Sequence, residues 1–332
     1  MWTESRLNDL LTTPSGALAQ DMKQLAGDIL VLGAGGKMGP SLCVLAKRAG
    51  KRVIAVSRFS DARERQYLEK NGVETIAADL LDAKQRAALP QAENVIYMAG
   101  RKFGTQGQEW LTWAMNAGLP AFIAEQYRDS HIVVFSSGNV YPLVQPQSGG
   151  SKESDAPGPV GEYAMSCLAR ERAFEYAAQA YGTKVLLYRL NYAADLRYGV
   201  LYDIAGRILN EELVSLRTPC FNVIWQGSAN EIALRALLKA GSPAFKLNVT
   251  GPEILSVKAT ALRLGEILGK TPLFEGEEGT DAYLSDASRA AGLFGPPCVS
   301  ADTLIEWQGR WLLDGGRTLG KPTHFEERKG AY

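Results

Sequence analysis

The stretch Asp28-Ile29-Leu30-Val31-Leu32-Gly33-Ala34-Gly35-Gly36-Lys37-Met38-Gly39 decides the fold. Its apolar run, 29–32, predicts a buried strand, and apolar residues at helical spacing from Met38 to Ala49 predict a helix that ends at Gly50. A strand, a glycine turn and a helix N-terminus together make an anion site, because backbone N–H groups and the helix dipole both favour a phosphate there. A surface turn is the alternative, but the flanking strand and helix favour a dinucleotide site.

The three glycines of this G-x-x-G-x-x-G spacing would have separate roles in such a site. Gly33 would permit the tight turn, Gly36 would let a pyrophosphate approach the backbone, and Gly39 would let the helix pack closely on the strand. Lys37 and Met38 lie between the last two glycines. We therefore count these five residues as cofactor-binding.

The composition narrows the class of protein. The chain has 332 residues, of which 46% are apolar, enough for one large domain or two small ones. Basic and acidic residues number 36 each, so we expect no nucleic-acid partner and no anionic membrane surface. No apolar run could span a bilayer and no signal peptide is evident, which favours a cytoplasmic protein. The four cysteines are widely spaced and the histidines number two, so no disulfide framework and no metal site are expected.

The end of the second predicted strand, 53–56, bears on the choice of cofactor. An acidic residue there would accept a hydrogen bond from the adenosine ribose and favour NAD. Here Ser57 is followed by Arg58, whose guanidinium could hold the 2′-phosphate of NADP. The cofactor is therefore predicted to be NAD or NADP, with a lean to NADP. A solvated charge at a strand end is the alternative for Arg58.

Strands and helices alternate through the first half, which predicts an α/β protein with a Rossmann-type doubly wound parallel sheet. We expect an N-terminal helical extension over 1–27, a nucleotide-binding domain over 28–190, and a smaller α/β substrate module mainly over 191–314. That module should be discontinuous, with one late strand returning to the sheet. The extension should pack on the sheet or on a second subunit. The polar tail, 315–332, should be a surface arm with His324 in solvent.

A second motif lies at the fifth predicted strand. The strand 131–135 runs into Ser136-Ser137-Gly138-Asn139-Val140-Tyr141-Pro142, and a helix that begins near Gly161 carries Tyr163. With the glycine spacing, this motif resembles the extended short-chain dehydrogenase/reductase family, the sugar-nucleotide epimerase and dehydratase group. The opening G-A-G-G-x-M-G is also similar to dihydrodipicolinate reductases, but the two serines followed by Val-Tyr reject that alternative. The resemblance covers about residues 28–314 and departs at Pro142, where the family has a glycine.

The resemblance implies positions for substrate and cofactor. Ser137 would hydrogen-bond a substrate carbonyl or alcohol and Tyr163 would exchange a proton with it, although a strand-end serine can simply satisfy turn amides. Asn116 would prop the backbone beside the active site. Lys102, in the loop after the fourth strand, is a candidate substrate contact, although loop lysines are more often solvated. The further cofactor contacts implied are Asp79 and Leu80 near the adenine, Met98, Ala99 and Gly100 beneath the cofactor, and Ser136, Tyr163 and Asn191 near the nicotinamide.

The main departure from the family is Cys167. The family carries Tyr-x-x-x-Lys, which places both side chains on one helix face, and its lysine lowers the pKa of the tyrosine. A cation about 4 Å away at an effective dielectric of about 20 is worth roughly 4 kcal/mol, or about three pKa units, so without it Tyr163 should be mainly a proton donor.

Another cation, Lys102 or Lys152, could replace the missing lysine. The enzyme could instead work chiefly in the reducing direction or use Glu162 as base, or it could have lost this chemistry. Cys167 as a catalytic nucleophile is a further idea, but no neighbouring group is evident to make it a thiolate, and a space-filling role is simpler.

In the second half, Asn222 and Trp225 join Asn139 as candidate substrate contacts. An aromatic face beside amide groups suits a polyol, although Trp225 could equally be core. We therefore predict an NAD(P)-dependent oxidoreductase or epimerase that acts on a sugar, sugar acid or related polyol by hydride transfer coupled to proton exchange at Tyr163. The alternatives are a non-catalytic nucleotide-binding or sensing protein and a lyase or dehydratase with transient oxidation. The resemblance also implies a homodimer through the helices 110–126 and 163–180.

Overall fold

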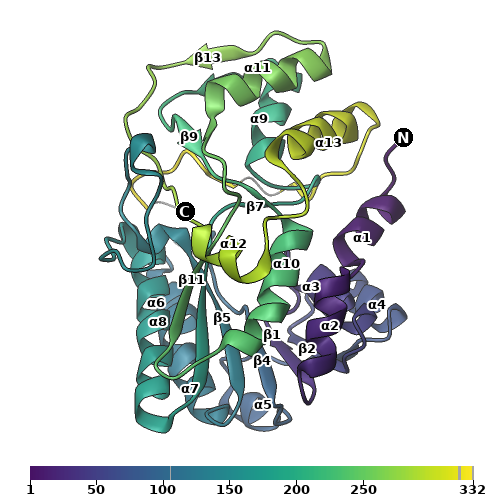
Figure 1. Cartoon of the computed structure of the whole chain (residues 1–332), viewed down its shortest axis with the longest axis vertical. Helices are drawn as coiled ribbons and strands as arrows, with labels where there is room; N and C mark the ends of the chain where they lie inside the picture. The colour runs from purple at the N-terminus through teal and green to yellow at the C-terminus, as the bar shows by residue number, and fades with distance from the viewer. Residues whose placement is uncertain (105, 321–322, 331–332) are drawn as a thin grey trace.

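The computed structural model describes residues 1–104, 106–320 and 323–330. Its centre is a seven-stranded sheet in the order β11-β6-β5-β4-β1-β2-β3 (Figure 1), and every neighbouring pair runs parallel. The order reverses between β1 and β4, which makes the sheet doubly wound. The strands are β1 (Ile29–Leu32), β2 (Val53–Ser57), β3 (Glu74–Ala77), β4 (Asn94–Tyr97), β5 (His131–Ser137), β6 (Lys184–Leu190) and β11 (Phe245–Val249).

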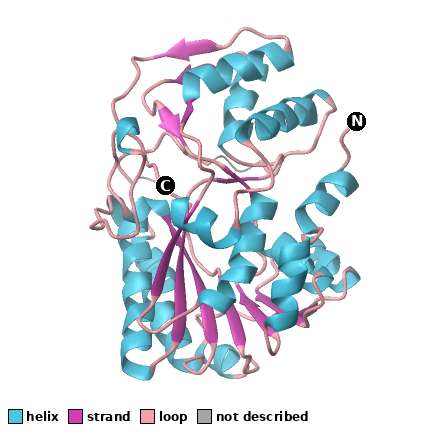
Figure 2. Ribbon diagram, viewed as in Figure 1, coloured by secondary structure: helices cyan, strands magenta, loops and turns pink. Residues whose placement is uncertain are grey.

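Helices cover both faces of this sheet (Figure 2). Successive side chains of a strand point to opposite faces, so Ile29 and Val31 join one apolar core while Leu30 and Leu32 join the other. The central strands β1 and β4 are buried on both faces, as expected of a parallel sheet, whereas the edge strand β3 is partly exposed. The predicted doubly wound α/β fold is confirmed. One layer contains α3 (Gly39–Arg48) and α10 (Gln226–Arg235), the other contains α7 (Leu119–Gln126) and α8 (Gly161–Tyr181), and α4 (Ala62–Lys70), α5 (Ala83–Ala87) and α12 (Ser288–Phe294) are shorter.

The crossover from β4 to β5 is not the single helix that the sequence predicts. It consists of α6 (Glu109–Trp113), the π-helical segment η1 (Ala114–Gly118) and α7, and the N–H of Leu119 bonds to the carbonyl of Ala114. Pro120 has no N–H, so it cannot donate to the carbonyl four residues earlier, which belongs to Asn116. Such π segments often mark functional sites, and here the segment carries the asparagine that the sequence singled out.

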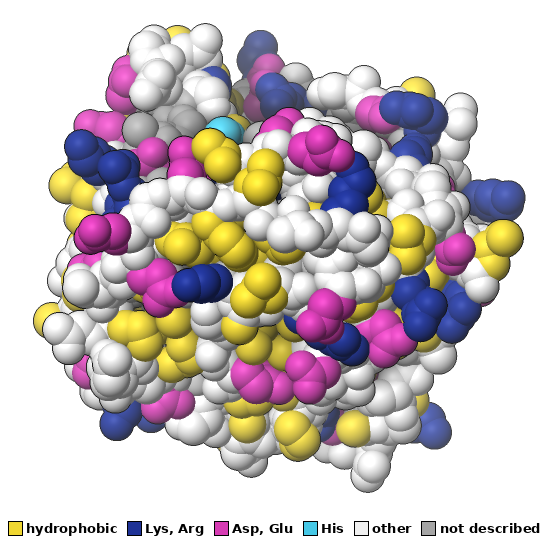
Figure 3. Space-filling view, turned by 90° about the horizontal axis from the view of Figure 1, so that it is seen from above, with side chains coloured by type: hydrophobic (Ala, Val, Ile, Leu, Met, Phe, Trp, Pro, Cys, Tyr) yellow, Lys and Arg dark blue, Asp and Glu magenta, His cyan; other side chains and the backbone are white. Residues whose placement is uncertain are grey.

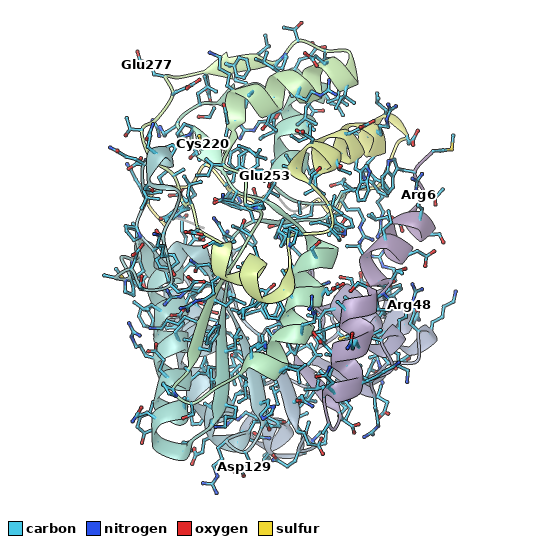
Figure 4. All side chains as sticks on the ribbon, viewed as in Figure 1. Arg6, Arg48, Asp129, Cys220, Glu253 and Glu277 are labelled. Atoms are coloured by element: carbon cyan, nitrogen blue, oxygen red, sulfur yellow. The ribbon has the colours of Figure 1, made fainter. Side chains whose placement is uncertain are left out.

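The N-terminal extension packs on the helical layer formed by α3 and α10. It contains α1 (Glu4–Thr12) and α2 (Gly16–Gln24), and Leu18 of α2 is fully buried in the sheet's core. Ser15 caps α2 by accepting the Leu18 N–H at 3.0 Å. Arg48 at the end of α3 lies beside these helices (Figure 4) and pairs with Asp9 at 3.1 Å. The extension thus belongs to the same fold.

The upper part of the molecule has its own apolar core. It surrounds α9 (Val200–Leu209), α11 (Val257–Leu268) and α13 (Ala301–Leu313). Seen from above, its surface mixes acidic, basic and apolar side chains (Figure 3). The pairs of short strands are β7 (Ala193–Ala194) with β10 (Ile224–Trp225), β8 (Leu213–Ser215) with β13 (Leu273–Glu275), and β9 (Cys220–Phe221) with β12 (Leu255–Ser256); the short helical turns of the chain are η2 (Gly138–Val140), η3 (Pro146–Ser148) and η4 (Ala236–Lys239).

The C-terminal tail is not the surface arm that its polar composition predicts. Phe325 is 2% exposed and lies in the upper core, with its ring centre 6.5 Å from that of Phe221. The Phe325 carbonyl accepts a hydrogen bond from the Tyr192 hydroxyl at 3.4 Å, and the Thr323 N–H donates to the carboxylate of Asp203 at 2.8 Å. The expectation was wrong because one buried aromatic ring anchors an otherwise polar segment.

The tail also reaches the sheet domain. A Cβ on Gly330 would lie 2.4 Å from the carbonyl oxygen of Val160, directly before α8. Earlier in the tail, Leu319 donates its N–H to the Arg197 carbonyl at 3.1 Å. The described parts of the tail therefore connect the upper core with the first turn of α8.

The burial of Phe325 gives a stability prediction. Phe325→Ala should lower the free energy of unfolding by about 3–5 kcal/mol, because it leaves a cavity in the upper core. Leu313→Ala is the matched control, since Leu313 is 55% exposed and its truncation should cost about 0.5 kcal/mol or less. Urea denaturation measures both, and equal, small losses would show that the tail does not pack as described.

Candidate active site

The glycine turn between β1 and α3 is shaped by two close approaches. Gly33 has φ +92°, and a Cβ there would lie 2.5 Å from the backbone nitrogen of Ala99. A Cβ on Gly39 would lie 2.2 Å from the carbonyl oxygen of Ala34. By contrast, a Cβ on Gly36 would meet only the Gly33 carbonyl oxygen, at an ordinary 3.6 Å. Packing thus requires Gly33 and Gly39, whereas Gly36 borders open space, as a backbone that approaches a ligand should.

A cavity of about 950 Å³ opens over this turn. Gly36 and Lys37 form part of its wall, together with the start of α3 and residues of α4. The C-terminal tail forms another part of the wall through Arg317 and His324. His324 is exposed, as expected, although it borders this cavity. The full set of lining residues is Glu4, Asn8, Gly35, Gly36, Lys37, Pro40, Ser41, Asp61, Arg63, Glu64, Tyr67, Phe103, Arg197, Arg317, Thr318, Leu319, Gly320 and His324.

The other predicted cofactor residues surround the turn at different depths. Ser57 is close to it, since a Cβ on Gly35 would lie 2.5 Å from the Ser57 hydroxyl oxygen and 3.2 Å from a carboxylate oxygen of Glu64. Arg58 is exposed and does not line the cavity. Asp79 also lies outside the lining, and its carboxylate caps the backbone N–H of Leu81 at 2.9 Å. Met98 is half-buried against the sheet's core, and Leu80 and Ala99 are buried.

Ser137 and Tyr163, predicted as the catalytic pair, come together at the carboxyl end of β5. The Ser137 hydroxyl donates to the Oδ1 atom of Asn139 at 2.9 Å, and it shares a hydrogen bond with the Tyr163 phenol. Burial raises the pKa of Tyr163 well above its usual value, the neighbouring Cys167 adds to this, and the Arg170 guanidinium opposes it. Tyr163 is therefore a protonated phenol at neutral pH, suited to donate rather than to abstract a proton.

Cys167 lies directly beside this phenol. It is 0% exposed, packs with Val140 and Tyr141, and shares a hydrogen bond with Tyr163. Burial raises the pKa of the Cys167 thiol, although Arg170 and Lys102 counter the shift. A buried thiol with a raised pKa is a poor nucleophile, so the space-filling role is the better account of Cys167.

Two cations approach the pair from different elements. Arg170 lies on α8 seven residues after Tyr163, on the same face, and is 6% exposed. Its Nη1 donates to the Phe135 carbonyl at 2.6 Å and its Nη2 to the Asn116 Oδ1 at 2.8 Å. Lys102, from the loop after β4, places its Nζ atom 5.6 Å from the centre of the Tyr163 ring. The site therefore has positive charge although α8 lacks the lysine.

Two other groups suggested by the sequence, Lys152 as the replacing cation and Glu162 as a base, face elsewhere. Lys152 bonds through its backbone N–H to Asp155 at 2.8 Å, and its charge acts on Asp286, whose pKa it helps to lower. Glu162 is exposed, and its carboxylate accepts the indole N–H of Trp113 on α6. Neither contact connects these side chains with the phenol.

Cation–ring and ring–ring contacts connect residues of the cavity wall with Lys102, which lies beside the phenol. The Lys37 Nζ atom lies 3.4 Å from the ring centre of Tyr198 and 4.5 Å from that of Phe103. Phe103 in turn contacts His324, at 5.7 Å between ring centres, and its own ring centre is 5.4 Å from Lys102 Nζ. Phe103 lines the cavity whereas Ser137 and Tyr163 do not, and the Lys102 Nζ atom lies near both rings, 5.4 Å from the centre of Phe103 and 5.6 Å from that of Tyr163.

Two predicted residues of the second half, Trp225 and Asn222, serve the fold. Trp225 is 2% exposed and packs edge-to-face on Trp307 in the upper core, with ring centres 5.6 Å apart, so it is not available to a polyol. The Asn222 amide donates to the Glu253 carbonyl at 2.9 Å and accepts from the Ser285 N–H at 3.0 Å, so these two bonds occupy its polar atoms. These two predictions of substrate contacts are wrong, because both side chains are buried within the upper module.

Asn191 lies closer to the site than Asn222 does. Its side chain abuts Gly138, where an added Cβ would lie 3.1 Å away, and its amide donates to the Tyr283 carbonyl at 3.1 Å. Ser136 faces inward and donates its hydroxyl to Glu171 at 2.6 Å, so it supports the strand end and does not face a ligand.

Four residues at the site escaped the sequence analysis: Arg170, Tyr198, Asp203 and His324. The spacing of Arg170 from Tyr163 on one helix face was a usable signal. Asp203 accepts the Thr323 N–H and hydroxyl, and burial raises the pKa of its carboxyl group. No local pattern predicts that Asp203 and His324 approach the loop of Lys102, because tertiary folding alone brings them there. The described residues hold no group of His, Cys, Asp or Glu that could bind a metal ion.

Comparison with known proteins agrees with this geometry. Residues 29–194 match the NAD dependent epimerase/dehydratase family. No curated protein sequence matches the chain significantly. Among solved structures, UDP-glucose 4-epimerase of Thermotoga maritima with UDP-glucose has a TM-score of 0.72 at 19% identity, over 87% of this chain and 99% of that one.

Two further structures show the same degree of likeness. UDP-glucose 4-epimerase of Thermus thermophilus, in complex with NAD, gives a TM-score of 0.71 at 20% identity, over 85% of this chain and 98% of that one. A UDP-glucuronic acid 4-epimerase variant of Bacillus cereus, with NAD and a fluorinated UDP-glucuronic acid, gives a TM-score of 0.72 at 18% identity, over 86% of this chain and 99% of that one. The family match spans half of the chain and includes both the glycine turn and the Ser137–Tyr163 pair. The chain therefore belongs to the NAD-dependent epimerase/dehydratase family of short-chain dehydrogenase/reductase enzymes.

Proposed function

We propose that this protein catalyses NAD-dependent epimerisation, or the related oxidation and reduction, at a carbinol carbon of a sugar or sugar acid. The observation that carries the proposal is the hydrogen-bonded contact between Ser137 and the protonated Tyr163 phenol at the end of β5. A hydroxyl and a phenol so placed can hold one carbonyl oxygen and give it a proton. The bound cofactor would supply the hydride donor and acceptor.

The residues present suit a dinucleotide. The glycine turn offers backbone N–H groups at the start of α3, Gly36 leaves room for a close approach, and the adjoining cavity measures about 950 Å³. Phe103 lines this cavity whereas Tyr163 does not, so we expect the Phe103 side chain to move when the nicotinamide end reaches the phenol.

Charge around the cavity supports NAD over NADP. The carboxylates of Asp61 and Glu64 line it near Ser57, whereas Arg58 does not. Arg63 also lines it, but its guanidinium is paired with Asp61 at 2.7 Å. Carboxylates favour the ribose hydroxyl of NAD and repel a 2′-phosphate.

The substrate class follows from the proton chemistry and from structural relatives. Several of the similar structures are described as epimerases of UDP-sugars, and three of them appear above. In this chain Lys102, Asp203 and Asn139 surround the catalytic pair with polar groups suited to hydroxyls. We propose a sugar or sugar-acid ring, free or as a sugar nucleotide.

The association proposed is a homodimer through α7 and α8. Both helices expose large apolar side chains, with Phe122 54% and Tyr176 62% exposed, and a shallow pocket of about 320 Å³ lies between them. Exposed apolar surface on adjacent helices is typical of an association site.

The cofactor proposal makes a prediction about Gly36. Gly36→Ala should fold normally but weaken NAD⁺ binding about tenfold or more, because its methyl group enters space needed by the pyrophosphate. Gly16→Ala, on α2, is the control, since an added Cβ there meets nothing within 4 Å and Gly16 is not part of the turn, whereas on Gly36 it would meet only the Gly33 carbonyl oxygen at an ordinary 3.6 Å. Isothermal titration calorimetry with NAD⁺ and NADP⁺ should show tighter NAD⁺ binding. Unchanged affinity in Gly36→Ala would contradict the placement of the cofactor.

The catalytic proposal is tested with Tyr163→Phe. This change should reduce turnover by about 10²- to 10⁴-fold while leaving NAD⁺ affinity unchanged, because only the proton donor is lost. Tyr176→Phe, on the exposed side of α8, should retain full activity. Product formation from a panel of free sugars, sugar acids and UDP-sugars is followed by chromatography, which detects epimers without net redox change. Full turnover by Tyr163→Phe would exclude the assigned role.

A non-catalytic nucleotide-binding function is the second candidate. The absence of a lysine at Cys167 and the absence of Tyr163 from the cavity wall favour it. Tight NAD⁺ binding without turnover of any member of the panel would support it. A dehydratase with transient oxidation would instead appear in the same chromatograms as loss of water.

The proposed dimer is tested by a substitution that places a charge at the centre of its interface. Tyr176→Glu should give a species of 36.0 kDa in light scattering, whereas the wild-type protein should give twice that mass. Tyr181→Phe serves as a mild control on the same helix. A wild-type monomer would exclude this association.

A further inference from the structure

A partly buried phenol that gives up a proton leaves a negative charge in a poorly solvated place. Burial alone raises the pKa of Tyr163 and so opposes that step. A nearby cation offsets the cost, and a cation that can also lose a proton can restore the phenol afterwards. Of the charged groups that face Tyr163, Arg170 and Lys102 are the candidates for stabilising the phenolate and for returning its proton.

Arg170 meets only the first requirement. Its guanidinium lowers the pKa of Tyr163 and of Cys167, but both terminal nitrogens are bonded, to the Phe135 carbonyl and to Asn116. A guanidinium also stays protonated in proteins. Arg170 can therefore stabilise charge but cannot return a proton.

Lys102 is held in position by the backbone next to it. The Asn116 side chain bonds Arg101 in both directions: its Oδ1 accepts the Arg101 N–H and its Nδ2 donates to the Arg101 carbonyl, each at 2.8 Å. Asn116 is itself fixed by Arg170 and by a 3.0 Å bond to the Ser166 hydroxyl, both from α8. The loop that carries Lys102 is thereby tied to the helix that carries Tyr163.

The surroundings of Lys102 complete the arrangement. Its Nζ atom lies 5.6 Å from the Tyr163 ring centre, and its charge interacts with the Cys167 thiol on α8 and with Asp203 on α9. Phe103 covers another side. Tyr163 and Cys167 of α8 and Phe103 of the same loop thus lie around the ammonium group, and the charge of Asp203 on α9 acts on it.

We propose that Lys102, carried on the loop that Asn116 clamps, is the proton-returning cation of Tyr163, in the role that α8 does not fill because it carries Cys167. This inference rests on the proposed function. As hydride reaches the carbonyl carbon, the phenol proton passes to the carbonyl oxygen and an alcohol forms. The Lys102 ammonium, directly or through one water, then gives a proton to the phenolate and becomes a neutral amine. The amine regains a proton from solvent, so charge and atoms balance.

The ionisation of Lys102 fits this role. Burial lowers its pKa from the usual value to about 8, with Cys167 and Asp203 opposing the shift. Lys102 is therefore largely charged at neutral pH and can still release its proton readily. Because the charged form is needed, reduction should slow as the pH rises through about 8.

The test reads the phenol directly and needs neither substrate nor cofactor. The full chain is prepared with 3,5-difluorotyrosine at position 163, whose phenol is a stronger acid than tyrosine, and is titrated by ¹⁹F NMR. Lys102→Met should reduce the acid dissociation constant of that phenol by about tenfold or more, since a nearby positive charge is lost. Lys102→Arg should restore most of the effect. Lys152→Met, a lysine change in a neighbouring loop, should have none.

A second measurement guards against a misfolded variant. Reductive ¹³C-methylation of the otherwise unmodified protein gives the pKa of Lys102 by NMR, expected near 8. An unchanged phenol titration in folded Lys102→Met, or in Lys102→Gln should the first variant not fold, would overturn the inference, as would an ordinary lysine pKa near 10.4. NAD⁺ calorimetry on the same samples tests the proposed function separately. Both titrations are made without cofactor, so a protein that fails to bind NAD⁺ would still give them.

Discussion

The ion pair between Glu171 and Arg189 fixes the geometry on which the site depends. The two side chains are 0% and 1% exposed, and two bonds of 2.9 and 2.7 Å join them. They connect α8 with β6, while the Ser136 hydroxyl connects β5 to the same carboxylate. Arg189 also donates to the Tyr141 hydroxyl at 2.6 Å. Removing either ion would leave a buried, uncompensated charge, so the pair defines where α8 sits more than it adds net stability. Tyr163 near the start of that helix and Ser137 at the end of β5 meet because of it.

A second constraint adds the loop after β4. Asn116 sits in a π-helical segment, pairs with the backbone of Arg101 and receives a bond from Arg170 on α8. Gly100 must lack a side chain here, because a Cβ would lie 2.5 Å from the Arg170 Nη2 atom. Strand end, loop and helix are therefore one connected unit. In place of the lysine four residues after the tyrosine, positive charge near Tyr163 comes from Arg170, further along the same helix, and from Lys102 on the loop after β4.

How far the sequence predicts this structure depends on how local each feature is. The glycine turn, the alternating strands and the Ser137–Tyr163 motif follow from short-range patterns, and the sheet order agrees with them. Trp225 was ambiguous because an aromatic residue beside amides suits a pocket and a core equally well, and only tertiary packing on Trp307 decides. The tail was misjudged because Phe325 gives no periodic signal among polar neighbours. Arg170 could have been found from its spacing, whereas the approach of His324 to Phe103 depends on contacts more than 200 residues apart in the chain.

The central claim is that a nicotinamide ring held from the glycine turn meets the Ser137–Tyr163 pair. The most direct measurement is a crystal structure of the full chain grown with NAD⁺. The account predicts the pyrophosphate over Gly36, the ring of Phe103 displaced, and the nicotinamide facing the Tyr163 phenol within a few ångströms. A dinucleotide bound with its nicotinamide turned away from Tyr163, or a nucleotide confined to the cavity with Phe103 unmoved, would contradict it.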